Sequence, residues 1–203
     1  LRIGFDPKLF TKKSLKIFFR KTNCKYVPIK KNLVDEIWMR EKNETKNIFY
    51  VLPKHSVGEG YKSKVNKIVS ELKKRKGDYQ FITASENNAW LLNIRGGDSK
   101  YTPIPYSYIL IDRKKNIKFF CDLKKISRSF KEKFKNIRFV NINSTKIFIS
   151  NIYNKKFIID KSTCSIYFEN IILKNNKVLN QNDPIYYLKS IKTKKEIENI
   201  KKA

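Results

Sequence analysis

The sequence has few of the residues from which self-contained active sites are built. Its single histidine, His55, lies in the Pro- and Gly-bounded stretch 53–58, which contains no acidic residue to orient an imidazole. Asp and Glu number only 18 and are scattered, so neither a paired-carboxylate pattern nor an HExxH metal-ligand spacing occurs. The six glycines form no GxGxxG or GxxxxGK[ST] phosphate loop. The sequence therefore predicts no metal site, acid–base pair or nucleotide-binding loop.

Cysteine and long apolar runs are also scarce. Cys24, Cys121 and Cys164 form no CxxC pair, and their odd number argues against a disulfide framework, so we expect reduced and mostly buried thiols. No apolar run approaches the roughly 20 residues that span a bilayer, and the basic N-terminus is not followed by an apolar signal core. We therefore expect no membrane association and a cytoplasmic location.

The residues that are abundant are lysine and apolar residues. Of 203 residues 40% are hydrophobic and 13% aromatic, which supports a folded core in one domain or two small ones. The net charge is +28, but 38 of the 46 basic residues are lysines spread along the whole chain. A surface selected to bind nucleic acid would favour clustered arginine. We expect only nonspecific attraction to polyanions, with a stand-alone basic binding module for nucleic acid or another polyanion as the alternative function.

Hydrophobic periodicity predicts strands and helices that alternate along the chain, which is typical of an α/β protein. Strands are expected at residues 3–5, 24–29, 79–83, 106–111, 116–121, 138–142 and 156–160. Helices are expected after a cap at Thr11, and at residues 32–38, 61–76, 85–92, 126–134 and from 162 or 163 to 173, with Gly77 as the C-cap of the third. The hairpin across residues 112–115 predicts a mixed sheet. Residues 39–60 are expected to form a loop or surface extension.

Four sequence segments, taken in order, resemble one known family. Residues 3–7 (IGFDP), 32–38 (NLVDEIW) and 89–98 (AWLLNIRGGD) match in order the GxDP, NLVDxIW and AWLxNxRGxD patterns of three-domain Xaa-Pro aminopeptidases of the creatinase/prolidase superfamily. Residues 192–197 (KTKKEI) are similar to the segment that leads into the catalytic domain of that family. The resemblance covers essentially the whole chain, and the ordered series is more specific than any one motif.

This resemblance implies a fold and a domain organisation. It implies a three-layer α/β/α domain with a mixed sheet, like the creatinase/prolidase N-terminal domain with its ribonuclease H-like motif, over residues 1–187. Residues 188–203 would form a linker and the start of a catalytic pita-bread domain beyond Ala203. Because a helix opens at the end of the chain and no Met begins it, we expect truncation at both ends.

The family removes an N-terminal residue that precedes proline. By the resemblance, the chain is a noncatalytic domain that packs on the catalytic domain of the same polypeptide and shapes substrate access and assembly, with a homodimer possible. Two divalent metal ions, Mn or Zn, would belong to the catalytic domain, and none to this chain. The chain alone would be inactive. A purely structural spacer is a third interpretation.

The best local candidates for function are Trp90, Arg95, Gly96, Gly97 and Asp98. Glycines beside an arginine let a partner's backbone approach while the guanidinium binds a carboxylate, and Asp98 could hold Arg95 in place. One hypothesis puts Arg95 and Asp98 on the rim of the peptide site, facing the catalytic domain. The other is a structural turn in which Arg95 pairs with Asp98 or caps carbonyls. Trp38 and Trp90 are expected to be core or interdomain anchors.

Overall fold

A six-stranded mixed sheet forms the centre of the protein, for which a computed structural model describes residues 1–38 and 47–202. The strands lie in the order β10-β9-β4-β6-β7-β8. Their bounds are β4 Tyr79–Ile82, β6 Tyr108–Asp112, β7 Ile117–Cys121, β8 Ile137–Asn141, β9 Lys156–Ile159 and β10 Lys177–Asn180. Strands β10, β9 and β4 run parallel, β6 is antiparallel to both of its neighbours, and β7 and β8 are parallel. The expected mixed sheet is confirmed.

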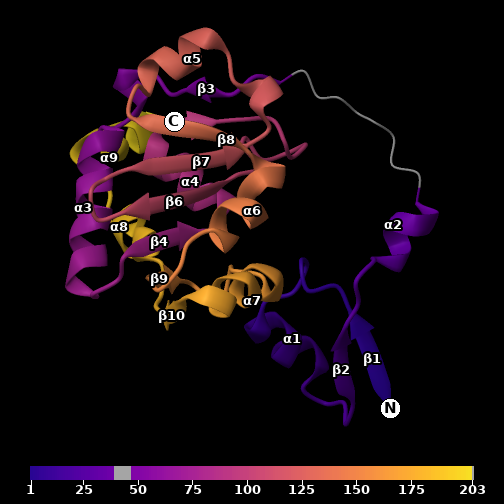
Figure 1. Ribbon diagram of the computed structural model, residues 1–203. Coiled ribbons are helices and arrows are strands. Elements are labelled where there is room, and N and C mark those ends of the chain that lie inside the picture. The colour runs from indigo at the N-terminus through magenta and orange to yellow at the C-terminus, as the bar shows by residue number, and fades with distance from the viewer. Residues whose placement is uncertain (39–46, 203) are drawn as a thin grey trace.

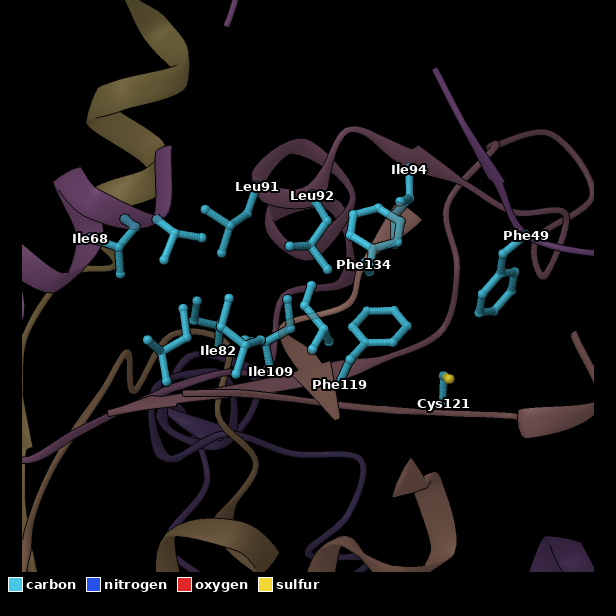
Figure 2. Packing of buried hydrophobic residues seen from close by; sticks show 14 of the residues in the cluster. Phe49, Ile68, Ile82, Leu91, Leu92, Ile94, Ile109, Phe119, Cys121 and Phe134 are labelled. Carbon is cyan, nitrogen blue, oxygen red and sulfur yellow. The ribbon is translucent and has the colours of Figure 1, made fainter. Parts of the chain in front are cut away.

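Alternating side chains on these strands divide the core into two clusters, one on each face of the sheet. Ile82, Ile109 and Phe119 belong to the cluster covered by α3 (Tyr61–Lys74), α4 (Ser85–Leu92), α5 (Arg128–Lys133) and α8 (Pro184–Ser190). Their sequence neighbours Phe81, Leu110 and Phe120 belong to the opposite cluster, covered by α6 (Thr145–Ser150) and α7 (Ile166–Asn175). Figure 1 shows the two sets of helices on either side of the sheet, and Figure 2 shows the first cluster. The architecture is the expected three layers.

Helix α3 ends in a way that the position of Gly77 only partly predicts. The left-handed residue is Lys76, with φ 57°. The backbone N–H of Lys76 donates to Lys73 O and that of Gly77 donates to Leu72 O, both at 3.0 Å, which is the Schellman pattern. A Cβ on Gly77 would lie 2.7 Å from the Ile158 side chain. Gly77 is therefore required for close packing on β9, and the expectation that it is the C-cap is wrong, because Arg75 is the C-cap and Lys76 is the left-handed residue.

The expectation of a loop over residues 39–60 is wrong for part of that segment. Strand β3 (Tyr50–Val51) pairs antiparallel with β5 (Ile94–Arg95), and the preceding Phe49 is only 2% exposed in the first core cluster. The 3₁₀ turn η1 (Lys54–Ser56) follows. The short apolar run is a strand because β5 supplies its partner, which the local sequence does not reveal. Residues 39–46 lie outside the described residues.

The start of helix α7 and the presence of two further elements differ from expectation. Helix α7 begins at Ile166 and not at residue 162 or 163, because the Asp160 carboxylate accepts hydrogen bonds from the backbone N–H and hydroxyl of Ser162 and shapes a turn before the helix. Ser165 caps α7 instead. Helix α6 was not predicted, and it contains most of the apolar segment at residues 147–152. Strand β10 was not predicted, because Val178 and Leu179 are its only apolar residues.

The N-terminal elements form a small unit beside α7 (Figure 1). Strands β1 (Arg2–Phe5) and β2 (Lys25–Pro28) pair parallel, and Thr11 caps α1 (Lys12–Phe19) as expected. Backbone N–H groups of Ile166 and Tyr167 donate to Phe10 O and Pro7 O, which joins this unit to the start of α7.

Helix α2 (Leu33–Ile37) shows the apolar face that its sequence predicts, but that face is exposed. Ile37 is 84% exposed and the adjacent Trp38 is 60% exposed. The expectation that Trp38 belongs to the core is therefore wrong, whereas its role as an interdomain anchor stays a prediction. The described helices include none that is both long and apolar enough to cross a bilayer.

The last helix, α9 (Lys194–Lys202), lies against η1, and the 3₁₀ turns η2 (Leu123–Lys125) and η3 (Ile142–Ser144) precede α5 and α6. Cys121 and Cys164 are buried, Cys24 is partly buried, and all three are free, as expected.

Candidate functional site

The candidate segment 90–98 begins at the end of α4 and continues through β5. Asn93 adopts the left-handed conformation, with φ 55°, and turns the chain from the helix into the strand. Its side-chain Nδ2 donates to Glu59 O at 2.8 Å, which joins this turn to the segment before α3. The turn places Trp90 near the C-terminal end of α4, and Arg95 opposite Tyr50 on β3.

Arg95 and Asp98 serve different parts of this segment. The Arg95 Nη1 donates to Ile94 O at 2.8 Å. Partial burial lowers the pKa of the guanidinium, whereas the Tyr50 side chain raises it. The Asp98 carboxylate forms an ion pair with Lys125 and accepts a hydrogen bond from the Tyr106 backbone N–H at 2.6 Å. Asp98 thus joins the 96–106 loop to η2, while Arg95 caps a carbonyl of its own strand.

The two glycines between them provide room for the segment before β3. A Cβ on Gly96 would lie 2.8 Å from the Phe49 ring and 3.0 Å from Pro105 Cα. A Cβ on Gly97 would lie 2.9 Å from Asn47 Cβ. Neither glycine has a positive φ, so close approach and not backbone conformation requires them. The segment that they admit belongs to this same chain.

Trp90 forms one wall of a charged site that the sequence did not predict. The Lys64 Nζ lies 4.0 Å from the centroid of the Trp90 ring and donates to Trp90 O at 2.9 Å and to Asn93 Oδ1 at 2.6 Å. Lys64 is only 4% exposed, although lysine side chains are rarely buried. Its position four residues before Ile68, on the apolar face of α3, indicates that it is buried. Because the chain contains 38 lysines, this position did not distinguish Lys64 from the others.

The charges around Lys64 oppose the effect of its burial. Burial lowers the pKa of the Lys64 ammonium to about 8, whereas the carboxylates of Glu196 and Glu59 raise it. The cations of Arg95 and Lys67 lower it further. The hydrogen bonds and the aromatic ring hold the ammonium group in place. Because its pKa lies near neutral pH, its charge is sensitive to small changes in its surroundings.

Two hollows meet at the Trp90 side chain. One, of about 220 Å³, is lined by Lys64, Glu59 and Glu196 together with the chain between α8 and α9. The other, of about 490 Å³, lies between Trp90, α8 and α9, and Tyr186, Lys189 and Ile200 line it. Within residues 1–38 and 47–202, no group of three or more His, Cys, Asp or Glu side chains could hold a metal ion. The described residues thus do not fit a dinuclear metal centre; they provide a charged surface beside an aromatic ring.

Architecture and sequence together define the class of the protein. The molecule is an α/β domain with a mixed sheet between two helical layers. The profile of the Creatinase/Prolidase N-terminal domain family matches residues 40–196, and the chain belongs to this family.

Three of the proteins to which the chain is similar are named as prolyl aminopeptidases. The chain is 28% identical over 204 residues to Xaa-Pro aminopeptidase ApepP of Drosophila melanogaster, covering 96% of the chain and 33% of that protein. It is 26% identical to Xaa-Pro aminopeptidase 1 of Dictyostelium discoideum, covering all of the chain and 34% of that protein. The chain is also similar to the X-prolyl aminopeptidase structure from Caenorhabditis elegans, which is described as a cytosolic enzyme with a di-nuclear active site. The TM-score is 0.84 and the identity 25%, and the match covers 99% of this chain and 34% of the C. elegans chain. The chain thus spans about a third of these relatives, and the resemblance drawn from the sequence motifs is confirmed.

Proposed function

We propose that the chain is the noncatalytic creatinase-type domain of an Xaa-Pro aminopeptidase, an enzyme that removes an N-terminal residue preceding proline. The main support is that relatives with this activity in their names align over 96% or more of the chain, while the chain accounts for about a third of their length. These comparisons favour this function over a stand-alone polyanion-binding module.

The proposal includes the division of the chain into residues 1–187, the α/β domain, and residues 188–203, the connection to a catalytic domain. Helix α8 extends over Pro184–Ser190, so such a connection would begin inside a helix that packs on the core. Tyr187, Ile191 and Ile200 are exposed on this connection. Exposed apolar side chains of this kind suit packing against the catalytic domain of the same polypeptide.

The remaining properties follow from the whole enzyme. Peptides with proline at the second position would be the substrates, and the two divalent metal ions, Mn or Zn, would lie in the catalytic domain. A cytoplasmic location is supported by the description of the C. elegans enzyme as cytosolic. A homodimer stays a prediction.

A peptidase assay tests this function. X-Pro peptides with added Mn²⁺ are incubated with the 203-residue chain and with the natural reading frame extended beyond Ala203. Hydrolysis by the extended protein alone is the expected result. Hydrolysis by neither protein would return the weight to a binding or spacer role, and hydrolysis by the short chain would contradict the noncatalytic assignment.

The candidate rim residues require a separate test. We propose that Arg95, with Gly96, Gly97, Asp98 and Trp90, faces the catalytic domain at the edge of the peptide site. Arg95→Ala in the extended enzyme is expected to lower kcat/KM, since it removes a partly buried cation that could bind a peptide carboxylate. Arg128→Ala is the control, because that side chain is almost fully exposed on α5. Unchanged kcat/KM and assembly in Arg95→Ala would leave a purely structural turn.

A further inference from the structure

Among the described residues, one hydrogen bond joins helix α9 to the body of the domain, and the polar contacts at its start are local to the helix. None of its residues is buried. Before its first turn, the Thr193 backbone N–H and hydroxyl donate to Glu196 Oε2 at 2.8 and 2.9 Å, and the Glu196 backbone N–H donates to Thr193 Oγ1 at 3.2 Å. Near its end, Asn199 Nδ2 donates to His55 O at 3.4 Å. Contacts of this kind stabilise a helix only modestly, so a single charge interaction can decide whether α9 stays docked.

The cap that begins α9 places Glu196 at the hollow that the buried Lys64 also lines. The Glu196 carboxylate raises the pKa of Lys64, and the Lys64 ammonium lowers the pKa of Glu196. The carboxylate of Glu196 comes from α9, whereas Lys64 is anchored in the body by Trp90 O and Asn93 Oδ1. The interaction therefore joins α9 to the body of the domain.

We propose that Lys64 is a positioning residue whose ammonium charge, acting on the Glu196 carboxylate, holds α9 in place on the domain. Loss of the charge on either side chain releases the helix. By thermodynamic linkage the effect is reciprocal, because docking of α9 must favour the charged form of Lys64 by the same factor by which the charge favours docking. If α9 leads into a catalytic domain, as the proposed function has it, the charge on Lys64 also helps to set the orientation of that domain.

The other charged groups around Lys64 do not replace this interaction. Glu59 faces Lys64 from the segment before α3, and Lys67 at 2.8 Å and the Ser63 hydroxyl at 2.5 Å also bind its carboxylate. Because Asn93 ties this segment to the body, its attraction for Lys64 does not involve α9. Arg95 on β5 and Lys67 on α3 repel the ammonium, and Lys192 lines the hollow from the segment before α9.

Among these facing groups, Glu196 is the only carboxylate that α9 contributes. With a Lys64 pKa of about 8, the charge would be lost between about pH 7 and pH 9.

Hydrogen exchange of the α9 amides, residues 194–202, tests the proposal in the full chain. After correction for intrinsic exchange, their protection is expected to fall about fivefold between pH 7 and pH 9, the low end of typical coupling between sites. Glu196→Gln is expected to show the low protection already at pH 7 and no further fall. Lys64→Arg, which keeps its charge, is expected to stay protected at pH 9. The matched control is Glu198→Gln on the same helix, whose partner Lys195 is also on α9; it is expected to behave like the unmodified chain.

Fluorescence of Trp90 provides a second and independent measurement. Trp38→Phe leaves Trp90 as the single tryptophan, 4.0 Å from the Lys64 Nζ. Its emission is expected to change with a midpoint near pH 8, and Glu196→Gln is expected to move that midpoint to lower pH, because the carboxylate raises the Lys64 pKa. An unmoved midpoint, unchanged α9 protection in Glu196→Gln, or a fall in protection that persists in Lys64→Arg would overturn the proposal. None of these readouts depends on peptidase activity, so they fail or succeed independently of the proposed function.

Discussion

The Asp98 carboxylate binds the Lys125 ammonium and accepts a 2.6 Å hydrogen bond from the Tyr106 backbone N–H. Both side chains of the ion pair are mostly buried, so the pair fastens the 96–106 loop to η2 at the edge of the first core cluster. This relationship explains the Asp of the RGGD sequence by local architecture, independently of any role at a peptide site.

Asp98→Asn is therefore expected to lower the free energy of unfolding by about 1–3 kcal/mol, because it removes the negative charge that a mostly buried ammonium binds. Urea denaturation measures this. The control is Glu132→Gln, which breaks the exposed pair with Arg128 and is expected to cost less than about 0.5 kcal/mol. Equal losses in the two variants would show that the Asp98–Lys125 pair does not fasten the loop.

Two neighbouring glycines provide a matched test of how α9 docks. A Cβ on Gly58 would lie 2.6 Å from Thr193 Cβ, whereas a Cβ on Gly60 would meet no atom within 4 Å. Gly58→Ala is expected to displace Thr193 and raise the rate of proteolytic cleavage in residues 190–202 several-fold. Gly60→Ala is expected to leave that rate unchanged. Similar cleavage of both variants would mean that Thr193 does not rest on Gly58.

Phe49 tests whether the segment before β3 belongs to the core. The ring is 2% exposed and lies 6.5 Å, centroid to centroid, from Phe119 and from Phe130. Phe49→Ala is expected to lower the free energy of unfolding by about 3–5 kcal/mol, as usual for a buried phenylalanine. Ile48→Ala, at a residue that is 54% exposed, is expected to cost less than about 1 kcal/mol in the same denaturant experiment. A small loss in Phe49→Ala would return this segment to the surface loop predicted from sequence.

Asp183 predicts a pH dependence of stability. Burial raises the pKa of its carboxyl above the ordinary 3.8, partly offset by hydrogen bonds from the Ile185 backbone and the Asn87 side chain. Just above pH 3.8 the folded protein then binds more protons at this site than the unfolded chain does. Asp183 therefore makes the free energy of unfolding fall as pH rises through this window.

This contribution is isolated by comparing the unmodified chain with Asp183→Asn in denaturant titrations from pH 4 upward. The lost hydrogen bonds lower the free energy of unfolding of the variant by a constant amount at every pH. The difference in free energy of unfolding between the two proteins is expected to become smaller as pH rises. A difference that grows with pH would show that the hydrogen bonds, and not burial, dominate the titration of Asp183.

Local sequence patterns predicted those elements whose signals are contained within a few residues. Thr11 caps α1, the 112–115 turn joins β6 and β7, and the apolar stripe of α3 packs on the sheet. Errors arose where a distant partner decides the structure. Tyr50 and Val51 form a strand because β5 lies beside them, and β10 forms because β9 offers a parallel edge. The candidate site shows the same division, since the RGGD residues were visible as a motif while Lys64 was hidden among similar residues.

By itself, the sequence determined the alternation of strands and helices, the mixed sheet and, through its ordered motifs, the family. These properties depend on hydrophobic periodicity and on short sequence patterns, and both are contained within a few neighbouring residues. Only the tertiary structure decided which lysine is buried under Trp90, which cation Asp98 binds and why Gly96 must lack a side chain. These relationships depend on packing between segments far apart in the chain, where burial changes the energy of a charge far more than its sequence neighbours do.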